Sequence, residues 1–209
     1  MKLHKEIEVV PVRDEDINLL EALKKDKVLM PINADYFDAQ YGGTLVCCLD
    51  PDHFKDTEGH IADMLKKANK PNRIAPITRA GGAIWLPKST LIDKVGMPRD
   101  EDLLYDIDIA LEHRLMYTIF LSVHAPCGAA ALNDLSLFDQ IELLVKGKER
   151  LKEKYAHVEG LQIKAFIVIC YPGLRRRMYF VSASNWNENT TKYEQYDYTS
   201  DHLFTTASA

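Results

Sequence analysis

Residues 116–128 read MYTIFLSVHAPCG, and this stretch decides the fold. It begins with a run of aliphatic, aromatic and β-branched side chains, which is typical of a strand. Because the run is apolar at successive rather than alternate positions, it indicates a parallel strand covered by helices on both faces. The stretch therefore predicts a central strand of an α/β fold, with His124, Cys127 and Gly128 directly after its apolar part.

The flanking sequence alternates strand patterns with helix patterns. Short apolar runs bounded by glycine or proline predict strands at 44–50, 73–86, 161–171 and 178–184. Helical spacing of apolar side chains predicts helices at 14–28, 57–70, 100–115 and 134–155. We expect Asp14 or Asp16 to cap the first helix and Asp134 to cap the last. The order predicts a mainly parallel central sheet flanked by helices, with an antiparallel strand at the end.

Length and composition are those of one globular domain. The chain has 209 residues, of which 46% are hydrophobic and 27% are charged. We interpret 1–209 as a single domain with a helical arm at about 1–30 and a frayed tail at about 205–209. The formal net charge of −5 argues against a nucleic acid or an anionic membrane surface as partner.

The sequence also predicts a cytoplasmic location. No apolar run approaches the roughly 18–20 residues that a membrane span needs, and the N-terminus lacks the apolar segment of a signal peptide. Thiols stay reduced in the cytoplasm, so the cysteines are candidates for burial or metal ligation rather than for disulfides. We assign Cys47 and Cys170 to the core, and His53, His60 and His113 to the surface.

Ligand chemistry in parallel sheets collects at the carboxyl ends of the strands. One strand ends near Cys48 and Asp50, another ends at Arg79, and the central strand ends near His124 and Cys127. If the first and third are neighbours, Cys48, His124 and Cys127 converge into a set that suits zinc and leaves a fourth position open. A single His-x-x-Cys match is weak evidence, because a lone cysteine in a strand is usually part of the core.

The order of the motifs resembles that of the β-class carbonic anhydrases. That family carries Cys-x-Asp-x-Arg, an Arg-Asn-Ala-Gly-like segment and His-x-x-Cys-Gly. The counterparts here are Cys48-Leu49-Asp50-Pro51-Asp52, Thr78-Arg79-Ala80-Gly81 and His124-Ala125-Pro126-Cys127-Gly128. The similarity covers roughly residues 40–184 and implies Zn²⁺ on Cys48, His124 and Cys127, with hydration of carbon dioxide to bicarbonate. It also implies a homodimer or larger homo-oligomer, in which helix 14–28 could take part.

Asp52 stands where the family has the arginine of Cys-x-Asp-x-Arg. In the family, this arginine holds the aspartate that orients the catalytic water. Asp50 is therefore either held by another cation, for which Arg79 is the candidate, or is free to bind zinc and close the site. Asp52 itself could simply face solvent after Pro51.

The resemblance implies two further contacts with the substrate. Gln40 is similar to a family glutamine that contacts substrate, although its spacing from Cys48 is imperfect. Gly128 would begin a helix whose positive end favours an anion such as bicarbonate.

Four functions remain open at this point. The first is zinc-dependent hydration of carbon dioxide, with Asp50 orienting the water. The second is a zinc-binding protein with little or no activity, in which Asp50 is the fourth ligand. The third keeps the zinc chemistry for a related small electrophile such as carbonyl sulfide or carbon disulfide. A thiol redox protein is weaker, because Cys47 and Cys48 are adjacent and no Cys-x-x-Cys occurs.

Overall fold

A six-stranded sheet in the order β1-β6-β5-β4-β2-β3 forms the centre of the molecule. The computed structural model describes residues 11–88, 99–173 and 175–197, so the predicted frayed tail lies outside the described residues. The strands are β1 (Leu29–Pro31), β2 (Gly43–Cys48), β3 (Ile74–Arg79), β4 (Thr118–Ala125), β5 (Gln162–Tyr171) and β6 (Arg175–Val181). The four strands β3, β2, β4 and β5 pair in parallel, while β6 is antiparallel to both β5 and β1. The predicted fold class is confirmed.

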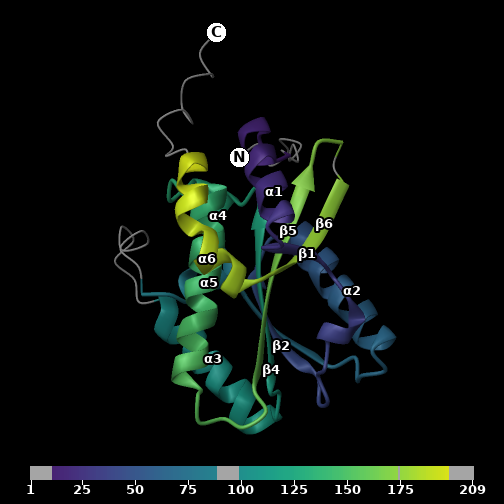
Figure 1. Ribbon diagram of the computed structural model, residues 1–209. Coiled ribbons are helices and arrows are strands. Elements are labelled where there is room, and N and C mark those ends of the chain that lie inside the picture. The colour runs from purple at the N-terminus through teal and green to yellow at the C-terminus, as the bar shows by residue number, and fades with distance from the viewer. Residues whose placement is uncertain (1–10, 89–98, 174, 198–209) are drawn as a thin grey trace, which may run out of the picture.

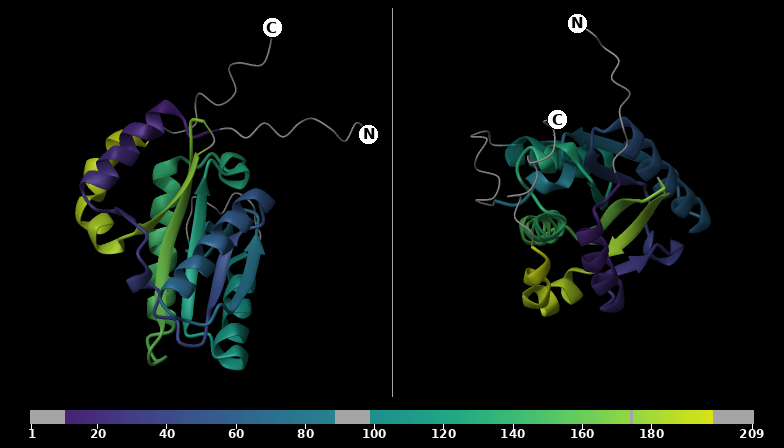
Figure 2. Two further views of the ribbon diagram at one scale, coloured as in Figure 1. Left: turned by 90° about the vertical axis from the view of Figure 1, so that its right-hand side faces the viewer. Right: turned by 90° about the horizontal axis from the view of Figure 1, so that it is seen from above.

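Helices cover both faces of the sheet (Figure 1). They are α1 (Asp14–Lys25), α2 (Pro51–Lys67), α3 (Arg99–Arg114), α4 (Gly128–Ala131), α5 (Leu137–Lys154) and α6 (Ala183–Tyr193), with 3₁₀ turns η1 (Ala34–Tyr36), η2 (Gly82–Trp85) and η4 (Glu194–Tyr196). One core cluster lies between the sheet and α1, α3, α5 and α6, and a smaller one lies between the sheet and α2 with η1. Figure 2 shows α2 on the opposite side of the sheet from α1 and α6.

The connections place a topological switch point between β2 and β4. From β2 the chain continues to its neighbour β3 through α2, on one face of the sheet. From β4 it continues in the other direction to β5 through α5, on the opposite face. Open α/β sheets bind ligands at such a point, beyond the carboxyl ends of the strands.

The ladder between β2 and β4 is short. It runs from Thr44↔Ile119 to Val46↔Leu121 and stops there. By contrast, β2 stays paired with β3 as far as Cys48, and β4 stays paired with β5 as far as Ala125. The two central strands therefore do not pair near their carboxyl ends, and side chains fill the space between them there.

Helix α2 begins six residues before the predicted start at residue 57. Pro51 is its first residue, a position where the missing N–H of proline costs nothing. Asp50 is the N-cap, and its Oδ1 accepts hydrogen bonds from the amides of Asp52 at 3.0 Å and His53 at 3.2 Å. The sequence after Asp50 is polar, so apolar spacing reveals the helix only from its second half onward.

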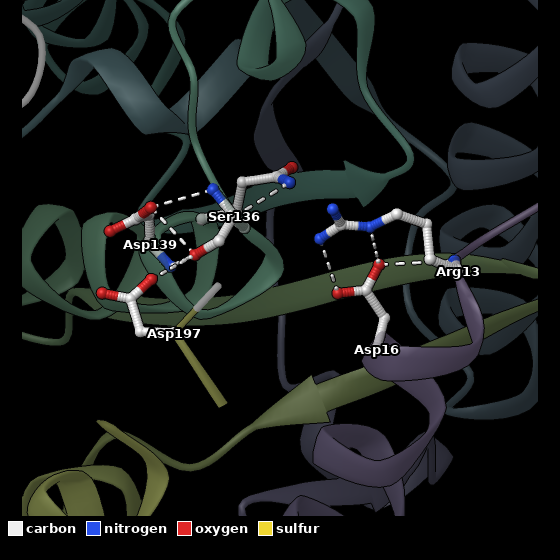
Figure 3. Close-up of polar contacts among 6 residues, drawn as sticks. Arg13, Asp16, Ser136, Asp139 and Asp197 are labelled. Atoms are coloured by element: carbon white, nitrogen blue, oxygen red, sulfur yellow. Dashed lines mark hydrogen bonds and ion pairs between the residues drawn. The ribbon is translucent and has the colours of Figure 1, made fainter. Parts of the chain in front are cut away.

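The predicted caps of two other helices are wrong (Figure 3). Helix α5 starts after Ser136, whose hydroxyl accepts from the Asp139 amide at 3.1 Å and lies 3.0 Å from Asp197 Oδ1. Asp134 instead adopts a left-handed φ of 55°. Helix α1 starts after Arg13, whose backbone N–H donates to Asp16 Oδ2 at 3.3 Å. An aspartate can support a helix start from the third residue as well as from the cap, so its presence alone does not locate the first residue.

Helix α1 packs on its own chain. Leu19, Leu20 and Leu23 are buried in the larger core cluster, and α1 contacts β1 and η4. Helix α6, which the sequence pattern does not predict, contributes the buried side chains Trp186 and Tyr193 to the same cluster. The apolar face of α1 is therefore covered without a partner subunit.

No helix among the described residues combines the length and the apolar character that crossing a bilayer requires.

Removing the cap of α5 should destabilise the protein. We expect Ser136→Ala to lower the free energy of unfolding by about 1 kcal/mol, because the Asp139 amide loses its acceptor. Urea denaturation followed by circular dichroism measures this change. The matched control is Ser184→Ala, an exposed serine inside α6 whose replacement should change stability by less than about 0.5 kcal/mol. An equal effect of the two substitutions would contradict the assigned cap.

Candidate metal centre

Three predicted ligands come together at the switch point. Cys48 is the last residue of β2, His124 is the penultimate residue of β4, and Cys127 follows β4 by two positions. Their candidate ligand atoms all lie within 4.8 Å of one another. All three residues are buried, with exposed fractions of 7%, 4% and 5%. Two sulfur atoms and one imidazole nitrogen form the donor set that zinc prefers, and three protein ligands leave one tetrahedral position open.

Cys48 and His124 approach the centre from opposite faces of the sheet. Cys48 belongs, with Val46, to the core cluster under α5. His124 lies on the same side of β4 as Phe120, which belongs to the cluster under α2. Side chains from opposite faces can meet here because the ladder between β2 and β4 has already ended at Val46↔Leu121.

The imidazole of His124 has unsatisfied polar atoms. Both its Nδ1 and its Nε2 are buried, and neither has a nitrogen or oxygen partner for a hydrogen bond among the described residues. A buried nitrogen without a partner costs about 1–3 kcal/mol, and a metal ion on one of the two would remove part of that cost. The residues present therefore fit a metal ion.

The two thiols are electrostatically coupled. A hydrogen bond from the Cys127 thiol, opposed by burial, lowers the pKa of Cys48 to about 4. The same contact, together with burial, raises the pKa of Cys127. The backbone N–H of Gly81 also donates to Cys48 Sγ at 3.2 Å. Cys48 is therefore the sulfur of the pair that loses its proton more readily, and metal ligation by both sulfurs would require Cys127 to lose its proton as well.

The glycine pair after β3 supports Cys48 from the side. Gly81 and Gly82 adopt left-handed φ values of 87° and 60°. A Cβ on Gly82 would lie 2.5 Å from the backbone carbon of Cys47 and 2.5 Å from the nitrogen of Cys48. Only glycine allows the backbone at position 82 to lie this close to Cys47 and Cys48. The Gly-Gly pair in the sequence could have indicated this support of Cys48, which the sequence analysis does not predict.

Asp50 lies beside the centre without being part of it. The group of mutually close ligand atoms among the described residues contains the two cysteines and His124, and it does not include Asp50. Burial raises the pKa of Asp50, but the His53 amide, the two nearby imidazoles and the Asp52 amide outweigh it and lower the pKa below its usual value. The carboxylate is therefore held ionised by the first turn of α2.

Arg79, the cation that we expect to hold Asp50, is paired with other carboxylates in the structure. Arg79 points to α3, where its guanidinium pairs with Asp102 at 3.3 Å and with Asp106 at 3.9 Å. The reason is that α3 contacts β3 and carries Asp102 and Asp106 within reach of the guanidinium. The backbone amides of α2 satisfy Asp50 in place of a cation.

The two predicted substrate contacts fare differently. Gln40 is exposed and precedes β2, whereas the centre lies at the other end of that strand. Six strand residues span about 17 Å, so Gln40 does not reach the centre of its own chain, and its contact with substrate stays a prediction. Gly128 does begin a helix, but α4 has only four residues and contributes little of a helix dipole.

His53 is the residue of this region that the sequence analysis misplaced. It is 7% exposed rather than on the surface, and its ring stacks on that of His124 with centroids 3.9 Å apart and planes at 25°. Burial and the adjacent His124 lower the pKa of His53 to about 4. Because the helix pattern became visible only at residue 57, His53 seemed to lie in a loop.

The other assignments of cysteines and histidines agree with the structure. Cys47 and Cys170 are buried in the core, with exposed fractions of 2% and 0%. His60 and His113 are exposed on α2 and α3.

Comparisons with known proteins give structural matches only. No protein-family model and no curated protein matches the sequence. The solved structures include a carbonic anhydrase from Streptococcus mutans, 15% identical over 82% of this chain and 99% of that chain, at a TM-score of 0.41. Another match is the β-carbonic anhydrase CafD of Aspergillus fumigatus, as a mutant, 14% identical over 74% of this chain and 99% of that chain, at a TM-score of 0.42.

A third match is the apo form of a carbon disulfide hydrolase, 14% identical over 78% of this chain and 88% of that chain, at a TM-score of 0.37. Likeness at these identities and TM-scores says nothing about activity. The function has to be argued from the site itself.

A side chain at position 82 should damage the centre and the fold together. We expect Gly82→Ala to lower the free energy of unfolding by about 2 kcal/mol or more, because its Cβ collides with the backbone at Cys48. Gly59→Ala is the matched control, since that glycine is in α2 and a Cβ there has nothing within 4 Å. The control should gain about 0.5–1 kcal/mol from helix propensity. Urea denaturation measures both, and a neutral Gly82→Ala would refute the close approach.

Proposed function

We propose that the protein is a zinc-dependent lyase that hydrates carbon dioxide to bicarbonate. The observation that carries the proposal is the buried group of Cys48, His124 and Cys127, with its ligand atoms within 4.8 Å of one another at the switch point of the sheet. Zinc bound there would act as a Lewis acid and make a nucleophile of water near neutral pH. Two thiolates donate more charge than neutral ligands do, so we expect the activity to favour alkaline pH.

Asp50 is the residue that we assign to orienting the reacting water. Its Oδ1 is engaged by the amides of Asp52 and His53, which fixes the carboxylate at the edge of the centre. Within the described ranges Oδ2 accepts no hydrogen bond, so it can accept one from water. In the family that the motifs resemble, an arginine holds the corresponding aspartate, and here the start of α2 would take over that task. The Asp50 carboxylate stays ionised under this arrangement, as a hydrogen-bond acceptor requires.

A zinc-binding protein with little or no activity is the second candidate. It is favoured by Asp52, which stands in the place of the arginine, because an aspartate without a countercharge can turn onto the metal. The use of Asp50 Oδ1 as the cap of α2 speaks against this candidate, since ligation would compete with two amide hydrogen bonds. Carbonyl sulfide and carbon disulfide are small electrophiles suited to the same chemistry, and they are alternative substrates for the first candidate.

We further propose the homodimer and the cytoplasmic location that the sequence suggests. Because α1 covers its apolar face within its own chain, a dimer would use another surface as well.

Metal content and activity test the proposal directly. The full-length protein should contain about one zinc per chain by elemental analysis and should accelerate carbon dioxide hydration in stopped-flow assays. Cys127→Ser should weaken zinc affinity by more than about 100-fold and abolish activity, because a ligand is lost. Cys170→Ala, a buried cysteine outside the group, should keep zinc. A folded wild-type protein that binds no zinc would end both zinc candidates.

Replacing Asp50 separates the two candidates. Asparagine is as good a helix cap as aspartate, so Asp50→Asn should leave α2 and zinc affinity unchanged. If Asp50 orients the water, kcat/KM for carbon dioxide should fall by about 100-fold or more. Asp52→Asn, an exposed neighbour, is the control and should be close to wild type. A large loss of zinc affinity in Asp50→Asn, without activity in the wild type, would favour the closed site.

A further inference from the structure

We propose that His53 is a positioning residue for His124, an inference that rests on the metal centre proposed above. The two rings are stacked, with centroids 3.9 Å apart and planes at 25°, and the residues are only 7% and 4% exposed. His53 thus covers one face of the imidazole that would bind the metal. We infer that this contact, rather than a hydrogen bond, sets the plane of the His124 ring.

The described residues do not supply the usual carboxylate or carbonyl partner that orients a metal-binding histidine. Such a histidine normally donates its second ring N–H to a carboxylate, a backbone carbonyl or water, and that bond fixes the ring. In the described part of the chain, no carboxylate and no backbone carbonyl accepts from either nitrogen of His124, and the polar group beside the ring is the sulfur of Cys48. A metal ion would engage one nitrogen and leave the other as it is. Packing is then what the described residues offer to orient the ring, and the ring of His53 provides a flat aromatic surface against it.

The start of α2 holds His53 firmly in place. Its N–H donates to Asp50 Oδ1 at 3.2 Å, and its carbonyl accepts from Thr57 Oγ1 at 2.7 Å. From β6, Arg176 donates to the carbonyl of Asp52 at 3.4 Å and pairs with Asp56 at 2.6 Å. This first turn is therefore bonded to the sheet on which His124 lies, so the spacing between the two rings is built into the fold.

The geometry favours a role for the face of His53 and not for its nitrogens. Nδ1 of His53 is buried and has no hydrogen-bond partner among the residues that the structure describes. Its ring nitrogens are not among the mutually close ligand atoms of the centre. The lone pairs of an imidazole lie in the ring plane, whereas stacked rings face each other through their π surfaces. An aromatic ring without nitrogen should consequently replace His53.

Metal affinity and a cobalt spectrum test this role in the full-length protein. Zinc affinity is measured by competition with a chelator, and the visible spectrum of the cobalt-loaded protein reports the ligand geometry. His53→Ala should weaken zinc binding by about 10- to 100-fold and alter the cobalt bands. His53→Phe should stay within about threefold of wild type and keep the bands. His60→Ala, an exposed histidine on the same helix, is the control and should match the wild type.

A second readout needs no metal. The ring protons of His124 in the stacked arrangement feel the ring current of residue 53, which NMR of the metal-free protein detects. Their shifts should move in His53→Ala and stay near wild type in His53→Phe. Thermal unfolding confirms that each variant is folded, and if His53→Ala does not fold, His53→Leu fills the space without a flat ring and is read in its place.

The outcomes distinguish this inference from the proposed function. If the wild type binds zinc and His53→Ala binds it equally well with the same cobalt spectrum, only the positioning role is overturned. If His53→Phe loses as much affinity as His53→Ala, a nitrogen of His53 is needed and the stacking role is also overturned. If the wild type binds no zinc, the proposed function and this inference fall together.

Discussion

The ladder between β2 and β4 ends at Val46↔Leu121, and the candidate centre depends on that early end. As long as two strands are bonded, the side chains on their two faces are separated by backbone. Beyond the last pair, Cys48 can approach from the side of α5 and His124 from the side of α2. The switch point of the sheet thus becomes a place where two strand residues and Cys127, from the connection between β4 and α4, bring three donor atoms together away from solvent.

The start of α2 is the second constraint on the centre, because its first turn fixes the positions of both Asp50 and His53. Asp50 lies between the end of β2 and the first residue of α2 and is the N-cap of this helix. Its carboxylate accepts hydrogen bonds from two backbone amides of the first turn. Three residues later, His53 lies on His124. The exchange of the expected arginine for Asp52 therefore does not leave Asp50 unsupported. Arg176 comes from β6 instead and bonds to the Asp52 carbonyl and to Asp56, so that a cation from a distant strand holds the same turn.

Much of this architecture could be predicted from the sequence. The features that could not be predicted each have a physical reason. The strands that end at Cys48 and near His124 are apolar on both faces, which marks them as central and parallel. The rule that chemistry lies at the carboxyl ends then selects the ligand group. The start of α2 has a polar sequence without the helical spacing of apolar residues, so the sequence does not show that His53 lies on a helix and is buried. The partner of Arg79 depends on where the side chains of α3 lie, and no pattern in the strand encodes it.

Cys48 and His124 belong to strands between which the chain completes α2, β3 and α3. The ligand group is therefore not present in any local segment of the chain, and it forms only when β2 and β4 have paired in the sheet. A metal ion that binds this group and not the unfolded chain draws its affinity partly from the folding equilibrium. Any substitution that loosens the sheet, even on a strand far from the sulfurs, would then register as weaker metal retention. The amount of metal retained would then report the fraction of protein molecules that are folded.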